Sequence, residues 1–238
     1  MDLVILAKFI GASIAVGVGA MGSGFGEGLT AGKAAESISR QPKITGEILR
    51  TMLISQAVTE TAGIFGLVVA ILLLFVAPSE GEPSKIAAFF AAGICMGIGG
   101  IGAGIGCGMA GGAACESVAR HPRISSAILL NTLIGQAITQ TGCIFALVIS
   151  FILIFMAPVS SNIGVIGGVL GAGFSMGIGA IGAGTNSGFI TARANWAVAR
   201  NAKTSGLILR IMLLGQAVDT TVVIFSMIIA FLLLLVHG

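Results

Sequence analysis

Charged side chains are scarce in this sequence. Asp, Glu, Lys and Arg together make up 9% of its 238 residues, whereas a soluble domain of this size carries about 25%. The mean hydropathy of +1.08 agrees with that scarcity, and together they exclude a soluble globular fold. The stretch 124–192 contains no charged residue at all, and it is too long for a single membrane helix of about 20 residues. We therefore predict an integral membrane protein that crosses the bilayer several times.

Three kinds of motif are missing as well, and each absence excludes a class of function. The four cysteines all fall in apolar segments and show no metal-ligand spacing, which is typical of small buried thiols. No Gly-Lys-Ser or Gly-Lys-Thr follows a glycine run, so a phosphate-binding loop is excluded. The net charge of +3 comes from basic residues that lie between apolar runs, and it predicts no nucleic-acid partner. We expect no cofactor.

The sequence repeats itself at a spacing of 80 residues without a gap. AESISRQPKIT at 35–45 corresponds to CESVARHPRIS at 115–125 and to NWAVARNAKTS at 195–205. Each unit holds a Gly-rich apolar run, a short polar loop and a second apolar run, which predicts a two-helix hairpin. The units are hairpin 1 (1–80), hairpin 2 (81–160) and hairpin 3 (161–238). The predicted fold is thus an all-α membrane protein with six transmembrane helices in three tandem helical hairpins. The first run lacks a basic n-region and recurs twice, so we interpret it as a mature helix and not as a signal peptide.

Glycines recur at every second position in the first run of each hairpin. Such a period of two resembles a strand, but the length of the apolar runs favours a helix. On a helix the same glycines pair at i and i+4, and small residues let helix backbones approach closely in lipid. A tightly packed inner layer of helices follows. The glycines are Gly22, Gly24, Gly26 and Gly28, then Gly102, Gly104, Gly106 and Gly108, then Gly182, Gly184 and Gly188, with Asn186 interrupting the last set.

The basic residues predict the orientation in the membrane. Ten of the twelve flank the three hairpin loops, and only Lys8 and Lys85 lie toward the other side. Positively charged loops face the cytoplasm. We therefore expect cytoplasmic hairpin loops, with both termini and the linkers 77–84 and 157–162 on the outer side.

One carboxylate lies in the middle of the second helix of hairpin 1. Glu60 sits within ISQAVTETAGIF at 54–65, and the same position holds Gln140 in hairpin 2 and Thr220 in hairpin 3. Ionisable residues inside a membrane are costly and mark ion or proton pathways. A scaffold repeated three times thus carries its central carboxylate once, and we interpret Glu60 as an ion-binding residue.

A second carboxylate, Glu27, lies at a matching depth. It stands 14 residues before the expected loop at 41–45, and Glu60 stands 15 residues after it, so both are about 20 Å from the loop. Two buried carboxylates that face each other keep a proton or share a cation. With the hydroxyl of Thr61 and a backbone carbonyl they form an all-oxygen set that suits Na⁺. The alternative is that Glu27 only holds Glu60 by a hydrogen bond.

Hairpins 2 and 3 lack such a pair. Their corresponding residues are Cys107 with Gln140, and Ser187 with Thr220. Asp219 stands one residue before Thr220, about 100° around the helix. It is either a displaced ion site or a carboxylate satisfied by neighbouring hydroxyls.

These residues resemble a known family. GEGLTAGKAAESISRQP followed by QAVTETAGIFGLVVAILLL resembles the c-subunit, the rotor-ring proteolipid of F-type ATP synthases, and the resemblance covers all three hairpins. It looks like the sodium-translocating branch, which implies a Na⁺ site of Glu27, the Val58 carbonyl, Glu60 and Thr61. The alternative ion is H⁺. The implied function is to couple ion flow to rotation and to ATP synthesis or hydrolysis, so that the chain is not an enzyme on its own.

The resemblance also implies partners. Chains associate into a ring in a prokaryotic cell membrane, where lipid and the stator a-subunit surround them, and the loops dock on the central stalk. The loop residues concerned are Arg40, Gln41, Pro42, Arg120 and Arg200. In the family the ion site crosses a hairpin boundary, which implies that a neighbouring hairpin supplies Thr141 with the Ile138 carbonyl, or Thr221 with the Val218 carbonyl.

The chain departs from single-hairpin members of that family. Three fused hairpins resemble the multiplied proteolipids of V-type and archaeal rotary ATPases, which are the alternative assignment. Hairpin 3 lacks the loop proline and carries Trp196 where hairpin 1 has Glu36. A six-helix secondary transporter is a further alternative, although many such folds use inverted repeats and these repeats all run the same way. The paired carboxylates disfavour a purely structural scaffold.

Overall fold

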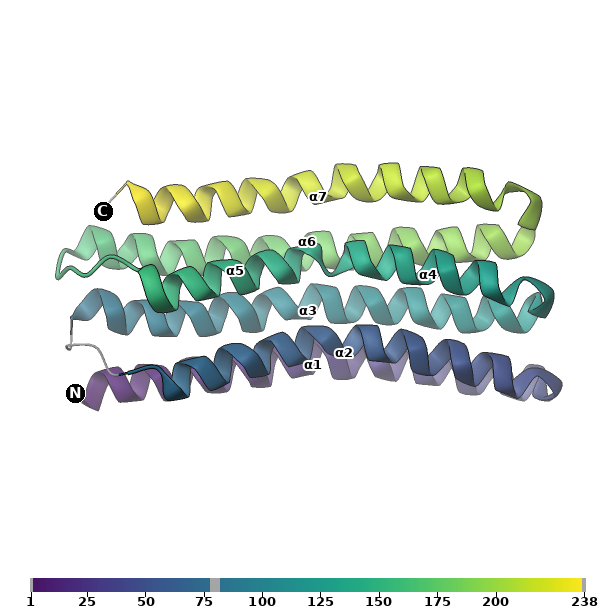
Figure 1. Ribbon diagram of the computed structural model, residues 1–238, viewed down its shortest axis with the longest axis horizontal. Helices are drawn as coiled ribbons and strands as arrows, with labels where there is room; N and C mark the ends of the chain where they lie inside the picture. The colour runs from purple at the N-terminus through teal and green to yellow at the C-terminus, as the bar shows by residue number, and fades with distance from the viewer. Residues whose placement is uncertain (1, 78–81, 237–238) are drawn as a thin grey trace.

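The chain folds into three helical hairpins, one after another (Figure 1). The computed structural model describes residues 2–77 and 82–236, so that part of the first outward linker, 78–81, lies outside the described residues. Six helical arms in the described part are long and apolar enough to cross a membrane. The predicted fold class is therefore confirmed. The helices are α1 (Asp2–Arg40), α2 (Thr45–Phe75), α3 (Pro83–Arg120), α4 (Ser125–Thr139), α5 (Thr141–Met156), α6 (Ile163–Arg200) and α7 (Ser205–Leu235).

The hairpin loops are shorter than the expected five residues. Gln41 separates α1 from a 3₁₀ turn, η1 (Pro42–Ile44), which leads directly into α2. Proline suits the first position of such a turn because that position needs no N–H donor. Hairpin 2 has the same turn, η2 (Pro122–Ile124). Hairpin 3 forms it as η3 (Ala202–Thr204) without proline, so the missing proline does not change the loop.

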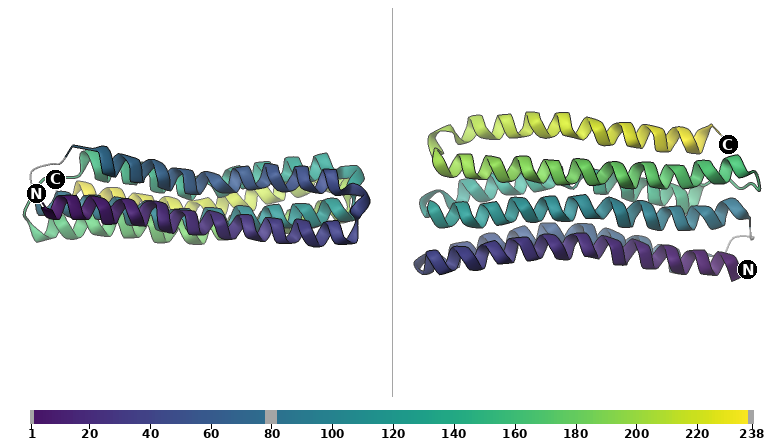
Figure 2. Two further views of the ribbon diagram at one scale, coloured as in Figure 1. Left: turned by 90° about the horizontal axis from the view of Figure 1, so that it is seen from below. Right: turned by 180° about the vertical axis from the view of Figure 1, so that it is seen from behind.

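The first helices of the three hairpins form one layer. α3 packs along α1 on one side and along α6 on the other, while α2, α4–α5 and α7 each pack on the first helix of their own hairpin. All three loops lie at one end of the bundle, and the described ends of the chain lie at the other (Figure 2). The chain is thus a row of hairpins, and only the middle one has a neighbour on both sides.

Glycine is what allows the first helices to approach so closely. A Cβ added at Gly22 of α1 would lie 2.6 Å from the Cα of Ile101 on α3. The same addition at Gly102 of α3 would lie 2.6 Å from the Cα of Ile181 on α6. Real Cβ atoms do not approach a backbone so closely. The predicted inner layer is therefore present. We call the contact between consecutive hairpins a seam, and the seam between α1 and α3 has the same geometry as the seam between α3 and α6.

Burial shows which flanks of the row are open. The share of buried residues in the most apolar 18-residue stretch of each first helix is 78% for α3, 39% for α1 and 44% for α6. An added Cβ at Gly24 or Gly28 of α1, or at Gly182 of α6, would meet no atom of the described residues within 4 Å apart from its own helix. These glycines belong to the same rows that pack tightly inside the chain. The outer face of α1 and the outer face of α6 thus carry glycines of the kind that pack closely inside the chain, but they have no partner within the described residues. We call these faces the flank of hairpin 1 and the flank of hairpin 3.

Candidate functional site

The two carboxylates of hairpin 1 lie on neighbouring helices. Glu27 is on α1 and Glu60 is on α2, and two hydrogen bonds join these helices within one turn of the carboxylates. The amide of Gln56, one turn before Glu60, donates to the backbone oxygen of Glu27 at 3.1 Å. Ser23, one turn before Glu27, donates to the backbone oxygen of Thr59 at 3.1 Å. These bonds fix the register of α1 against α2 and hold the two carboxylates at one depth.

The pair sits at the open flank of hairpin 1. Glu60 is exposed and Glu27 is half-buried, and the neighbouring Val58 and Thr61 are half-buried as well. Gln140, at the matching position of hairpin 2, is only 5% exposed. The difference arises because hairpin 1 covers Gln140, whereas no hairpin of the same chain covers Glu60.

Hairpin 2 shows how this position behaves when it is covered. The side-chain amide of Gln140 donates to the backbone oxygen of Val58 at 2.9 Å and approaches the sulfur of Cys107 at 3.5 Å. One turn earlier, the amide of Gln136 donates to the hydroxyl of Ser55 at 2.6 Å and to the backbone oxygen of Cys107 at 2.9 Å. The polar residues of hairpin 2 thus bond both within their own hairpin and to α2 of the preceding one.

Gln140 also divides the second arm of hairpin 2. The sequence predicts one continuous helix there, but α4 ends at Thr139 and α5 begins at Thr141. The Gln140 backbone still donates to Gln136 and accepts from Ile144. The arm therefore continues across the interruption, at the level of the Gln140 side chain.

Hairpin 3 repeats the contact to the preceding hairpin. The amide of Gln216 donates to the backbone oxygen of Gly135 at 3.0 Å and to the hydroxyl of Ser187 at 2.8 Å. Gly135 corresponds to Ser55 of hairpin 1. The hydroxyls of Thr220 and Thr221 each bond to a carbonyl of their own helix, those of Gln216 and Val218.

Asp219 has a partner that neither expectation named. Its Oδ1 accepts a hydrogen bond from the side-chain amide of Asn186 at 2.8 Å. Its Oδ2 is buried and finds no donor among the described residues. The carboxylate is therefore tied to the residue that interrupts the third glycine row, and not to a hydroxyl.

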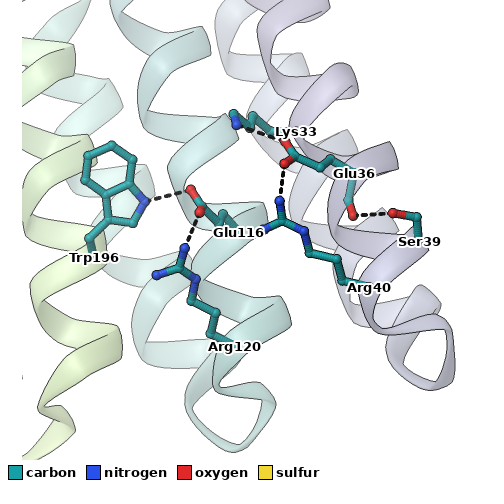
Figure 3. Close-up of polar contacts among 7 residues, drawn as sticks. All are labelled: Lys33, Glu36, Ser39, Arg40, Glu116, Arg120 and Trp196. Atoms are coloured by element: carbon teal, nitrogen blue, oxygen red, sulfur yellow. Dashed lines mark hydrogen bonds and ion pairs between the residues drawn. The ribbon is translucent and has the colours of Figure 1, made fainter.

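The charged residues near the loops form pairs at the helix ends (Figure 3). Glu36 accepts from Lys33 at 2.9 Å and from Arg40, and Glu116 accepts from Arg120. The indole of Trp196 donates to the other oxygen of Glu116 at 3.1 Å, which joins hairpin 3 to hairpin 2. The pairs of Glu36 are exposed to solvent, where water and salt screen such ion pairs strongly.

The atoms that could serve as ligands for an ion at this site are oxygens. Throughout residues 2–77 and 82–236, no three His, Cys, Asp or Glu side chains gather closely enough to hold a metal ion. The four cysteines are buried and free. One chain alone thus offers the carboxylates of Glu27 and Glu60 with neighbouring hydroxyls and carbonyls. That set can neutralise one monovalent cation or share a proton.

Sequence reasoning missed the glutamines that position this site. Gln56, Gln136 and Gln216 make the same bond to the first helix of their own hairpin. Their signal was present, because a glutamine recurs at the same place of an apolar helix in all three repeats. A polar residue kept in every copy of a membrane hairpin indicates a hydrogen bond between helices.

Comparison with known proteins agrees with this architecture. The profile of the ATP synthase C-subunit family matches the chain three times, over residues 10–73, 90–153 and 170–233. The ATP synthase c-subunit of Alkaliphilus oremlandii is 51% identical over 77 residues, which cover 32% of this chain and 86% of that protein. For the ATP synthase c-subunit of Natranaerobius thermophilus the identity is 52% over 80 residues, which cover 34% and 92%. The K-subunit of the A-type ATP synthase of Methanocaldococcus jannaschii is 33% identical over 229 residues, which cover 95% of this chain and 94% of that protein.

Proposed function

The chain belongs to the ATP synthase C-subunit family, which it repeats three times, and we propose that it carries ions in the rotor ring of a rotary ATP synthase or ATPase. Like its relatives, it is a membrane subunit and not a catalytic subunit. The single observation that carries the proposal is the pairing of α1 with α2, which holds Glu27 and Glu60 at one depth. Ring self-association, docking of the loops on a central stalk and contact with the stator a-subunit belong to the same proposal.

The proposed ion is Na⁺, bound by Glu60 and Glu27. Hairpin 2 supports a site at which the carboxylate is neutralised, because the Gln140 amide faces the Val58 carbonyl there. An amide is a permanent, neutral donor, so it satisfies that carbonyl without an ion. Glu60 has no such donor, and a carboxylate needs a cation or a proton before it can face a carbonyl. A threonine hydroxyl from the neighbouring hairpin would complete an all-oxygen site, which favours a hard cation. H⁺ remains the alternative cargo.

The proposed site is completed by a neighbouring hairpin. In hairpins 2 and 3 the polar residues bond to the second helix of the preceding hairpin. The hairpin that precedes hairpin 1 is hairpin 3 of another copy. Of the two sets that the resemblance allows, this order favours the Val218 carbonyl with Thr221. Thr141 and the Ile138 carbonyl instead lie toward the Ser187–Thr220 position of hairpin 3.

Occupancy of the site would govern rotation. Glu60 lies on an exposed part of α2, where a free carboxylate at mid-membrane costs about 2.5–3.5 kcal/mol or more. With Na⁺ or H⁺ bound, the residue is neutral and can pass through lipid. A basic residue of the stator would release the ion and allow refilling.

The three hairpins would then differ in function. Hairpin 1 (1–80) binds the ion, hairpin 2 (81–160) has no carboxylate at the site, and hairpin 3 (161–238) is degenerate and carries Asp219. We place the loops with Arg40, Gln41, Pro42, Arg120 and Arg200 on the cytoplasmic side, toward the stalk. Their common location at one end of the bundle supports this orientation.

Carbodiimide labelling of the intact ring, read by peptide mass spectrometry, tests the proposal. Glu60 should be the principal labelled residue, and Na⁺ should slow its labelling. Glu60→Gln should abolish coupled transport and leave the ring assembled. Labelling that concentrates on Asp219 would contradict the assignment of Glu60, and labelling that Na⁺ does not slow would assign H⁺ as the ion.

A further inference from the structure

The flank of hairpin 3 and the flank of hairpin 1 carry the same kinds of residue as the two helix faces that meet at each internal seam. Gly22 of α1 meets Ile101 of α3, and Gly102 of α3 meets Ile181 of α6. If a second copy of the chain follows hairpin 3 with the same geometry, Gly182 of α6 meets Met21 of α1 in that copy. Gly182 is open on its packing side, and Met21 is 60% exposed. The flank of hairpin 3 therefore fits the flank of hairpin 1 in a second copy of the same chain, head to tail.

We propose that this seam between copies places the Asn186–Asp219 pair against Glu60 and Glu27 of the next copy. The inference rests on the proposed function and deepens it, because it assigns a further carboxylate to the same site. Asp219 would thus belong to the ion site of its neighbour. It lies on α7, at the opposite end of the row from α2, which carries Glu60 of the same chain (Figure 1).

The internal seams show that these positions lie where consecutive hairpins meet. Asn186 and Asp219 occupy the places of Gly106 and Thr139 in hairpin 2, and of Gly26 and Thr59 in hairpin 1. A Cβ added at Gly106 would run into the Gly184 carbonyl of the following hairpin and lie 2.9 Å from the methyl carbon of Thr139. Both residues of such a pair therefore line the seam.

The depth of Asp219 follows from the neighbouring bonds. Gln140 of hairpin 2 bonds to Val58, the residue directly before Thr59. Glu60 holds the place of Gln140, and Asp219 holds the place of Thr59. Repeating the seam hence brings Asp219 to the level of Glu60 in the next copy.

The seam between copies must also be wider than the seams inside a chain. Glycine is needed at position 106 because even a Cβ would collide there, yet the equivalent Asn186 has a whole side chain. Helices α6 and α1 of adjacent copies are consequently held further apart at this level. The added space leaves room for the amide, for Asp219 and for an ion, and it offers a partner to the unpaired Oδ2 of Asp219.

Three carboxylates at one seam cannot all be charged cheaply. When no cation is bound, the negative charge of Asp219 makes it harder for the adjacent Glu60 to lose its proton. Carbodiimides react with the protonated acid. Asp219→Asn should therefore slow the labelling of Glu60, by about tenfold for a like charge within contact range, measured without Na⁺ at one fixed pH.

Rings assembled from two variants test whether the effect crosses between copies. One variant carries Glu60→Gln and keeps Asp219, and the other carries Asp219→Asn and keeps Glu60. When the first is in excess, each remaining Glu60 faces an intact Asp219 of its neighbour. We expect its labelling to return to the rate of the unmodified ring. No return in mixed rings, or no effect of Asp219→Asn in uniform rings, would overturn the inference.

Two further variants guard against effects on assembly. Glu47→Gln removes an exposed carboxylate from the first turn of α2, far from the seam, and it should leave the labelling rate unchanged. The double change Asn186→Gly and Asp219→Thr restores the residues of the internal seams, and it should slow labelling as Asp219→Asn does. Normal labelling in that double variant would also overturn the inference. If Glu60 of the unmodified ring is not labelled at all, the proposed function itself has failed.

Discussion

At the scale of single residues, one position separates the three hairpins. It holds Glu60 in hairpin 1, Gln140 in hairpin 2 and Thr220 in hairpin 3. The amide of Gln140 fills its seam with a permanent hydrogen bond to Val58, and the hydroxyl of Thr220 turns back to its own helix. Of these three side chains only the carboxylate can ionise, which is why the proposed function assigns ion uptake and release to hairpin 1.

The three equivalent threonines should differ in their effect on ion binding. Thr221→Val should weaken protection of Glu60 by Na⁺ about tenfold, the effect of one lost hydrogen bond to a charged group. In the proposed arrangement, Thr221 faces hairpin 1 of the next copy, whereas Thr61 and Thr141 face positions without a carboxylate. The Na⁺ concentration that halves the carbodiimide labelling rate measures this affinity.

Thr61→Val and Thr141→Val serve as the matched controls. Both remove the same hydroxyl from the same place of a hairpin, and both should leave protection close to that of the unmodified ring. Weakening by Thr61→Val alone would show that hairpin 1 supplies its own hydroxyl, and the neighbour arrangement would be wrong.

At the scale of helices, close approach depends on where each glycine points. Gly102 of α3 faces the backbone of α6, whereas Gly206 of α7 would accept a Cβ without meeting a described atom beyond its own helix within 4 Å. Both are glycines in helices, so their intrinsic helix propensity is the same. Packing therefore decides which of them alanine can replace.

Alanine at these two sites should have opposite effects on stability. Gly102→Ala should lower the unfolding free energy by about 1–3 kcal/mol, because overpacking forces the two helices apart. Gly206→Ala should leave it unchanged or raise it by up to about 1 kcal/mol through helix propensity. Denaturant midpoints of the purified ring in detergent measure both. Equal stability of the two variants would contradict the close packing of α3 on α6.

Polar contacts distinguish the seams from one another. Between hairpins 2 and 3, the amide of Asn195 donates to Thr132 at 2.9 Å and to the Ala110 carbonyl at 3.1 Å, and its oxygen accepts from Asn131 at 2.8 Å. Hairpin 1 has Ala35, Met52 and Thr51 at the corresponding places. In lipid, such hydrogen bonds favour one pairing of otherwise similar helices. The contact between hairpins 2 and 3 thus contains hydrogen bonds that depend on residues the repeat does not share.

At the scale of the whole molecule, the number of ion sites per hairpin sets the gearing. If Glu60 is the ion site, as proposed, one such residue per three hairpins would give few ions per turn of the ring, and the ATP made or hydrolysed in that turn would be shared among those few ions. Each ion then carries a larger share of the energy of ATP. An elementary charge gains only about 2.3 kcal/mol per 100 mV of membrane potential. Such a ring suits ATP-driven ion export, or synthesis at high driving force. If Asp219 belongs to the neighbour's Glu60 site, it adds no further ion to this count.

The threshold potential for ATP synthesis should therefore be high. We expect it to exceed, in liposomes with the whole enzyme, that of an enzyme with one carboxylate in every hairpin. Gln140→Glu should raise the measured number of ions per ATP, because it places a carboxylate beside the Val58 carbonyl and Thr61. An equal threshold, or Gln140→Glu rings with unchanged ions per ATP, would contradict this gearing.

The amino-acid sequence alone predicts the membrane class, the three hairpins and the depth of Glu27 and Glu60. These follow from hydropathy, from an exact repeat length and from the fixed rise of a helix, all of which are local properties of the chain. The family resemblance rested on the same local motifs, and comparison confirmed it.

The flank of the row on which each residue lies depends on how the hairpins pack against one another. The sequence does not reveal that Gln140 is buried against hairpin 1 while Glu60 is exposed, because that difference depends on a neighbour about 80 residues away. Nor does it pair Asn186 with Asp219, since 33 residues and a loop separate them. Burial and partners of this kind arise from the packing of whole hairpins, in which identical repeats acquire different surroundings according to their place in the row.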